Sequence, residues 1–171
     1  MIVFINGTFG VGKTTVAEHL IGRLPGSVLF DAELVGYFLR RIVMPIENPD
    51  DFQDLAMWRS LTMTTVRELR ATYGRTLIMP MTIARLDYFR EIVGGLRATE
   101  PDLHHFTLTA TPATLEARIR QSGEAIDWRL DHLLPCMVAL AAPEFATHIA
   151  TDGKTPDAVV DAIVARLPMC A

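Results

Sequence analysis

The chain has 171 residues, of which 50% are hydrophobic and 21% charged, and its formal net charge is −4. This balance is typical of a globular domain and argues against nucleic-acid binding, which needs clustered Lys and Arg. No apolar run reaches the roughly 18 residues of a membrane span, and we expect no secretion signal. The cysteines, Cys136 and Cys170, form no CxxC pair and no disulfide framework, so we expect a cytoplasmic protein.

The first predicted elements flank a glycine-rich loop. Residues 2–5 (IVFI) form an apolar run typical of a buried strand, and residues 14–24 carry apolar side chains at helical spacing. Between them, GTFGVGKT matches the phosphate-loop pattern G-x-x-x-x-G-K-[ST], whose backbone N–H groups and helix N-terminus face an anion. Lys13 is predicted to reach the β- and γ-phosphates of ATP, and Thr14 to bind Mg²⁺. The predicted nucleotide-binding residues of the loop are Gly7, Thr8, Gly10, Val11, Gly12, Lys13, Thr14 and Thr15.

Predicted strands and helices alternate along the rest of the chain. The strands are expected at residues 27–30, 75–81, 104–110 and 148–151, and the helices at 32–40, 54–73, 88–96, 114–120, 130–140 and 157–167. This alternation favours a parallel α/β sheet with helices on both faces, in a single domain over residues 1–171. Ligands bind beyond the carboxyl ends of such strands, which points to Asp31, Thr82, residues 110–112 and Asp152.

The motifs of two phosphate-loop classes are missing from the sequence. There is no DxxG with an N/T-KxD motif, as in switch GTPases, and Pro80 stands where a motor-type ATPase strand ends in Asp. The apolar run that does end in Asp is SVLFD, which makes Asp31 the notable carboxylate. We predict that Asp31 accepts the proton of an acceptor hydroxyl and holds Mg²⁺ directly or through water. Its place before the helix at 32–40 equally suits an N-cap.

Arginines surround a glycine breaker in TLEARIRQSGEAIDWR. Arg118 and Arg120 are predicted to neutralise the transferred group, within a lid at residues 118–130 that closes over the nucleotide. The alternative for Arg120 is a solvated i,i+4 pair with Glu116. The loop TDGKTP is predicted to frame the adenine through Asp152 and Pro156, or to be only the turn that starts the last helix.

The segment from about residue 40 to about residue 60 is predicted to bind the acceptor. Its candidate residues, with one from the end of the third strand, are Arg40, Asp51, Gln53, Trp58, Arg59 and Thr82. Two of them have a structural alternative. Trp58 falls on an apolar helical stripe that predicts a core position, and Arg40 suits the end of a helix because cations complement the helix dipole.

Five stretches in this order, FINGTFGVGKT, DFQDLAMWR, LIMPMTI, HHFTLTA and HIATD, resemble the tunicamycin-resistance ATP-binding proteins. In layout, that family is similar to chloramphenicol phosphotransferase, shikimate kinase and gluconate kinase. The resemblance implies a five-stranded sheet of order 2-3-1-4-5, ATP with Mg²⁺ as cofactors, and Asp31 serving the acceptor hydroxyl. It further implies resistance to tunicamycin, a uridine-containing nucleoside antibiotic with a fatty-acyl tail, by ATP-dependent phosphorylation of a hydroxyl. Binding of the antibiotic without transfer and a metabolic nucleoside or sugar-acid kinase are the alternatives.

The C-terminus departs from the family pattern. That pattern includes a basic C-terminal extension associated with membrane contact, whereas this sequence ends in ARLPMCA. We therefore expect a soluble protein without a membrane span. Its expected partner is a small-molecule acceptor rather than a nucleic acid, and the oligomeric state stays open.

Overall fold

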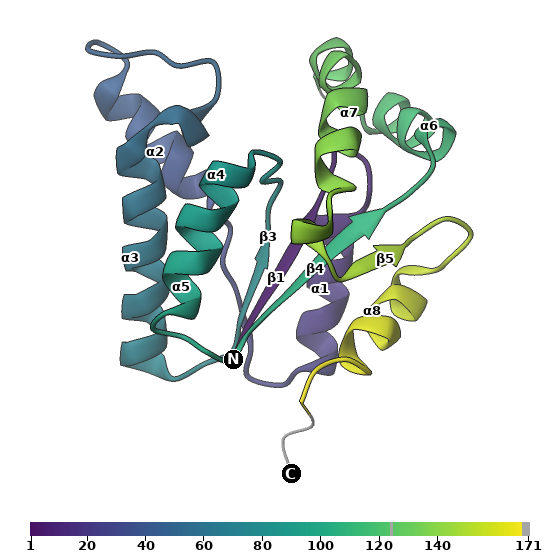
Figure 1. The fold of residues 1–171 in the computed structure, drawn as a ribbon, viewed down its shortest axis with the longest axis horizontal. Helices are drawn as coiled ribbons and strands as arrows, with labels where there is room; N and C mark the ends of the chain where they lie inside the picture. The colour runs from purple at the N-terminus through teal and green to yellow at the C-terminus, as the bar shows by residue number, and fades with distance from the viewer. Residues whose placement is uncertain (124, 169–171) are drawn as a thin grey trace.

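In the computed structural model, which describes residues 1–123 and 125–168, five parallel strands form one sheet with helices on both faces (Figure 1). The strands are β1 (Ile2–Gly7), β2 (Val28–Leu29), β3 (Leu77–Pro80), β4 (Leu103–Thr109) and β5 (His148–Ala150). The α-helices are α1 (Lys13–Arg23), α2 (Glu33–Val43), α3 (Ala56–Tyr73), α4 (Leu86–Phe89), α5 (Gly95–Arg97), α6 (Pro112–Ser122), α7 (Ile126–Leu140) and α8 (Pro156–Val164). Two short 3₁₀-helices, η1 (Phe52–Asp54) and η3 (Pro143–Phe145), and a π-helix, η2 (Arg90–Gly94), complete the helices of the described residues. The order β2-β3-β1-β4-β5 confirms the predicted sheet.

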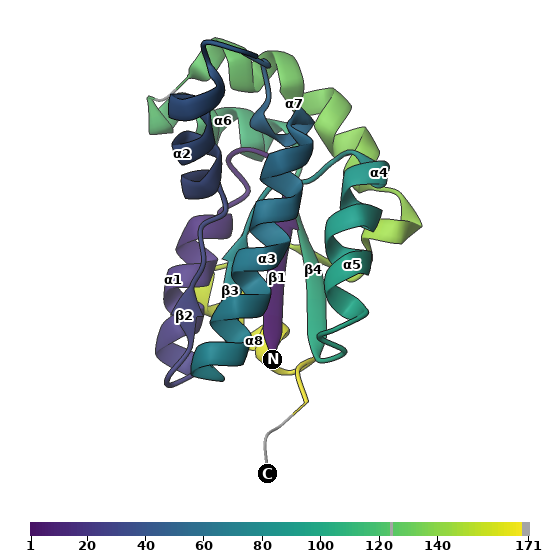
Figure 2. The same cartoon turned by 90° about the vertical axis from the view of Figure 1, so that its left-hand side faces the viewer.

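The central strand β1 is buried on both faces, and its side chains alternate between two cores. Ile2 and Phe4 pack into the core shared with α3, α4 and α5, whereas Val3 and Ile5 pack into the core shared with α1, α6 and α8. Figure 2 shows α3 and α5 in front of the sheet. Two-sided burial explains why the strand is a continuous apolar run.

Several elements differ in extent from the sequence prediction. The strand expected at 27–30 is reduced to Val28–Leu29, because β2 pairs only with β3 at the edge of the sheet. The helix expected at 114–120 begins earlier, at Pro112, because the Thr111 side chain caps it by accepting from the Thr114 backbone N–H. None of the helices in the described part of the chain is both long and apolar enough to cross a bilayer.

Candidate functional site

The loop between β1 and α1 has the backbone geometry of an anion cradle. Gly7, Gly10 and Gly12 have φ values of 146°, 73° and 97°, which side chains disfavour. A Cβ on Gly7 would lie 2.8 Å from the Leu108 carbonyl oxygen, whereas one on Gly12 would meet nothing within 4 Å. Among the described residues, no acceptor pairs with the backbone N–H groups of Phe9, Gly10, Gly12, Lys13 or Thr14. These donors lie at the start of α1, where the helix dipole also favours an anion, so the loop fits a phosphate group.

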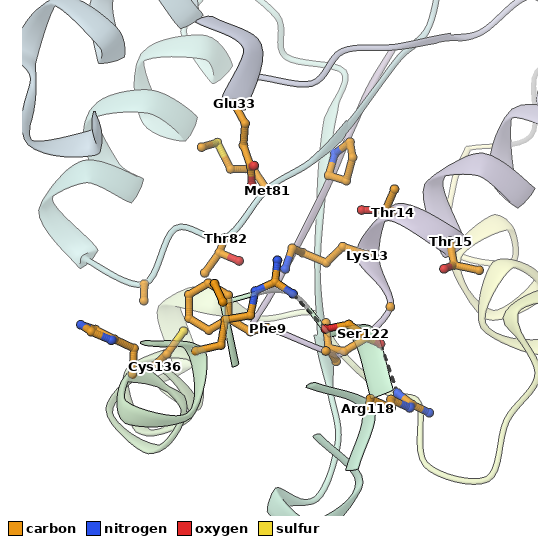
Figure 3. A pocket seen from close by; sticks show the side chains of 18 of the residues that line it. Phe9, Lys13, Thr14, Thr15, Glu33, Met81, Thr82, Arg118, Ser122 and Cys136 are labelled. Carbon is orange, nitrogen blue, oxygen red and sulfur yellow. Dashed lines mark hydrogen bonds between the residues drawn. The ribbon is translucent and has the colours of Figure 1, made fainter. Parts of the chain in front are cut away.

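Lys13 occupies the middle of the site (Figure 3). Its Nζ donates to the carbonyl oxygens of Gly7, at 2.9 Å, and Thr8, at 3.1 Å. Burial lowers the pKa of Lys13 to about 8. The ammonium group is therefore held over the loop, in surroundings where its charged form is less favourable than in water until an anion binds.

The lowered pKa of Lys13 predicts proton uptake when a nucleotide binds. At about pH 8.5 much of Lys13 is neutral in the empty protein, and the phosphates of ADP would favour its charged form. ADP affinity should therefore fall as the pH rises above about 8, and binding should take up a proton. Calorimetry in two buffers of different ionisation heat measures this uptake. Lys13→Met should abolish it, and equal heats in both buffers for the native protein would contradict the prediction.

A cleft of about 1460 Å³ extends from the loop in two directions. This exceeds the ~300–1000 Å³ that is usual for one small ligand, so the cleft has room for two. One end, named the nucleotide end after the predicted role of its residues, is lined by Arg118, Thr151, Lys154 and Pro156. The other end, named the acceptor end for the same reason, is lined by Asp31, Tyr37, Arg40, Asp51, Gln53 and Thr82. Lys13 lies between the two ends, where a group passing from one ligand to the other would lie.

Asp31 lines the cleft just beyond β2. Its Oδ1 accepts a hydrogen bond of 2.9 Å from the backbone N–H of Glu33, so the carboxylate also caps the first turn of α2. One carboxylate oxygen thus fixes the orientation of the side chain relative to the helix. The capping interaction and a role in the cleft are compatible for this residue.

Two predicted substrate residues do not line the cleft. Trp58 is fully buried, and its Nε1 donates to the Ala32 carbonyl oxygen at 3.0 Å, so the core alternative holds. The Arg59 guanidinium pairs with Glu91 at 2.6 Å and donates to the Gln53 carbonyl oxygen at 2.5 Å. Both side chains therefore stabilise the neighbouring chain instead of lining the cleft: Trp58 bonds to Ala32, and Arg59 bonds to Gln53 and lies over the Tyr88 ring of α4.

The acceptor end is tied to the phosphate loop through Thr82. The Thr82 Oγ1 donates to the Gly7 carbonyl oxygen at 2.8 Å, and the Thr82 carbonyl oxygen accepts from Gln53 Nε2 at 2.9 Å. The neighbouring Asp51 accepts from the Gln53 backbone N–H, and burial raises the pKa of the Asp51 carboxyl. Arg40 extends over this segment and donates to the Asp50 carbonyl oxygen at 2.7 Å. Arg40, Asp51, Gln53 and Thr82 thus all line the same cleft. Their binding of an acceptor remains a prediction.

The Phe52 ring packs against α2 at Gly36 and so holds the acceptor segment against this helix. A Cβ on Gly36 would lie 2.6 Å from the Phe52 ring, so Gly36→Ala should force the ring away and lower the free energy of unfolding by about 1–3 kcal/mol. Gly22→Ala in α1 is the matched control, because its Cβ meets nothing within 4 Å and Ala favours helix by ~0.5–1 kcal/mol. Urea unfolding measures both values. A Gly36→Ala protein as stable as Gly22→Ala would show that this contact is unimportant.

The predicted lid arginines separate in the structure. Arg118 lines the cleft, where it donates to Thr151 Oγ1 at 3.1 Å and to the Val11 carbonyl oxygen at 3.4 Å. Arg120 points away from the cleft and pairs with Glu116 at 2.7 Å, which is the solvated i,i+4 alternative. Arg129 lines the cleft and donates to Ser122 Oγ at 3.2 Å. Within the predicted 118–130 lid, residue 124 lies outside the described residues.

The two predicted adenine contacts also differ. Pro156 lines the cleft at the first turn of α8. Asp152 instead accepts hydrogen bonds from the backbone N–H and the hydroxyl of Thr111, and the bonds from Thr114 and Thr111 lower the pKa of its carboxyl. Asp152 therefore ties the loop after β5 to the start of α6 and does not line the cleft.

Sequence reasoning missed Asn6, which is fully buried at the end of β1. Its Oδ1 accepts from the backbone N–H groups of Gly7, at 2.8 Å, and Ile83, at 3.0 Å, and its Nδ2 donates to the Ile83 carbonyl oxygen. Asn6 thereby fixes the chain after β3 against the phosphate loop. A polar residue that interrupts an apolar strand just before a glycine loop is the signal that marks it.

A stripe on α7 was also missed. Trp128, His132 and Cys136 are four residues apart and all line the cleft. Burial raises the pKa of the Cys136 thiol. The i,i+4 spacing alone places the three on one helix face, but nothing in the sequence shows which face meets the site.

Comparison with known proteins agrees with this geometry. The family described as the AAA domain matches residues 2–131. The structure of the Deinococcus radiodurans tunicamycin resistance protein is similar, with 30% identity, a TM-score of 0.82, and 98% of this chain and 96% of that chain covered. A sugar kinase from Janibacter sp. HTCC2649 (20% identity, TM-score 0.66, 96% and 92% covered) and a gluconokinase from Sinorhizobium meliloti 1021 (15%, 0.65, 95% and 89%) share the fold. The comparison with curated protein sequences gives no match.

A glycine loop with free backbone donors, set between the central strand and the first helix of a parallel sheet, defines a phosphate-loop nucleotide-binding protein. The sheet order and the flanking helices are those of the small-molecule kinase fold. The chain belongs to the AAA domain family and to the group of proteins that includes the tunicamycin resistance protein of D. radiodurans. This confirms the resemblance drawn from the five sequence stretches.

Proposed function

We propose that this chain is an ATP-dependent phosphotransferase that acts on a hydroxyl of a small molecule, with tunicamycin as the acceptor to test first. The observation that carries the proposal is the single cleft in which Lys13 separates a phosphate-binding end from an end that contains Asp31. The relationship to the D. radiodurans tunicamycin resistance protein supports this acceptor.

The phosphate end holds the nucleotide in this proposal. The free N–H groups of the loop and the Lys13 ammonium bind the phosphates, and Arg118 and Pro156 flank the adenine. Thr14, exposed in the first turn of α1, offers its hydroxyl to Mg²⁺, and Asp31 would hold the ion through a water molecule, which leaves its second carboxylate oxygen for the proton. Bound ATP supplies the phosphoryl group, and Mg²⁺ neutralises part of its charge.

The acceptor end positions the hydroxyl and takes its proton. Asp31 accepts the proton, because its second carboxylate oxygen makes no bond to α2 and its first is already used by the Glu33 N–H. Arg129 adds positive charge from α7, beside Lys13. A lid over residues 118–130 would exclude water from this region, which limits hydrolysis of the nucleotide.

Mass spectrometry of tunicamycin, after incubation with the protein, ATP and Mg²⁺, tests the proposal. The expected result is a gain of one phosphoryl group that Lys13→Ala abolishes. If tunicamycin binds without a gain in mass, sequestration replaces transfer. If nucleosides or sugar acids are phosphorylated more efficiently than tunicamycin, the protein is a metabolic kinase.

A further inference from the structure

An aromatic cluster lines the cleft, with Phe9 from the phosphate loop and Trp128 and His132 from α7, and the proposed phosphoryl transfer assigns these side chains no contact with either ligand. The Trp128 indole is stacked on the His132 ring, with a centroid separation of 4.3 Å and an angle of 26° between the planes. The Phe9 ring meets Trp128 at 5.2 Å in an edge-on arrangement. All three residues line the cleft.

The exposure of Trp128 separates it from an ordinary core residue. Trp128 is 47% exposed, whereas Trp58 is 0% exposed. His132 covers one part of the indole and is itself held by a hydrogen bond of 2.7 Å from its Nδ1 to the Trp128 carbonyl oxygen. The His132 ring thus packs against one side of the indole, and nearly half of the Trp128 surface stays exposed where the residue lines the cleft. Leaving this apolar surface in water is unfavourable unless a ligand covers it.

The cluster lies at the acceptor side of the phosphate loop. Figure 3 shows Phe9 and Cys136 to the left of Lys13 and Thr15 to its right, with Arg118 below it. Thr82, whose carbonyl oxygen accepts from Gln53 of the acceptor segment, lies on the same side as Phe9. A ligand held at Asp31 and Gln53 therefore has the α7 aromatic face as its second wall.

We propose that Trp128, supported by His132 and Phe9, is a stacking subsite for a planar heterocyclic ring of the acceptor. This subsite adds a specificity determinant to the proposed function, and it rests on that function for the assumption that an acceptor binds beside ATP. Aromatic side chains bind nucleobases and similar rings through their faces, largely without regard to hydrogen-bonding groups. The same chemistry would suit the adenine of ATP, so the test separates the two rings.

Acrylamide quenching of tryptophan emission tests the subsite in the native protein. The sequence has two tryptophans, and Trp58 is fully buried, so the accessible emission comes from Trp128. Tunicamycin and uridine should each lower the quenching constant about twofold or more, because stacking covers the open indole face. Gluconate, which has no planar ring, should leave it unchanged, and a non-hydrolysable ATP analogue should lower it less than uridine does, because it would act only through closure of the 118–130 lid.

Variants then test the contribution to affinity. Trp128→Leu should weaken tunicamycin binding by about fivefold to 150-fold, which is the range for the loss of one stacked base, whereas Trp128→Phe should keep most of the affinity. Tyr73→Leu, at a residue that is 66% exposed and outside the cleft, is the control for loss of an exposed ring. Circular dichroism of each variant confirms that it is folded.

Each outcome decides between the two proposals. Protection by the ATP analogue alone would assign Trp128 to the adenine, and protection by no ligand would overturn the subsite. Protection by uridine or tunicamycin without any phosphoryl transfer would support the subsite and refute the kinase. If tunicamycin is phosphorylated and Trp128→Leu changes neither KM nor kcat, the kinase is supported and the stacking subsite is refuted.

Discussion

Asp31→Asn is expected to lower the kcat of phosphoryl transfer by about 10²–10⁴-fold while the protein stays folded. The amide oxygen of Asn can still accept from the Glu33 N–H, and Asn is as good an N-cap as Asp, so α2 keeps its first turn. The amide cannot take the proton of an acceptor hydroxyl. Steady-state kinetics on tunicamycin, together with a thermal unfolding curve, measures the two effects separately.

Asp31→Ala is the matched comparison, since it removes the cap and the carboxylate together. It should lose the same activity as Asp31→Asn and, in addition, about 0.5–2 kcal/mol of stability. An Asn variant with nearly native kcat would show that Asp31 only caps α2. The general-base role would then have to be reassigned within the acceptor end.

Lys13→Met should lower kcat/KM for transfer by about 10³-fold or more, because the ammonium is the cation that stands between the two ends of the cleft. The protein should unfold at the same or a higher temperature. The reason is that burial disfavours the charged form of Lys13, as its lowered pKa shows, and Met removes that unfavourable charge. Activity assays and thermal unfolding of the empty protein at pH 7 check both parts.

The other lysine of the sequence, Lys154, is the control for this change. It also lines the cleft, but at the nucleotide end and on an exposed loop. Lys154→Met should therefore raise the KM for ATP and leave kcat nearly unchanged. Equal losses from the two substitutions would mean that general positive potential, rather than the position of Lys13, supports the reaction.

The parts of the fold that follow from local pattern were predictable. The phosphate loop, the alternation of strands and helices, and the apolar character of β1 depend on neighbours in sequence and on burial on both sides. The two-residue length of β2 was not predictable, because it reflects a single pairing partner at the sheet edge. Its sequence, SVLF, is as apolar as that of a longer strand.

The candidate site was predictable where one residue is fixed by the loop or a strand end, as Lys13, Asp31 and Thr82 are. It was not predictable where a helix face had to be chosen. Arg118 and Arg120 are two residues apart on α6, so they point to different sides, and only the packing of Leu115 and Ile119 decides which one meets the cleft. Asp152 was misplaced for a related reason, since its hydroxyl partner, Thr111, is 41 residues away.

The two ends of the cleft depend on strands with different numbers of pairing partners, since β1 pairs with two strands and β2 with one. The phosphate loop follows the central strand, which pairs on both sides, whereas Asp31 follows an edge strand, and the chain after it is held by Trp58 at Ala32 and by Phe52 at Gly36. Backbone at such an edge can open locally without global unfolding. Substitutions that reshape the acceptor end can therefore accumulate while nucleotide binding persists, and a protein built in this way can exchange one acceptor for another during evolution.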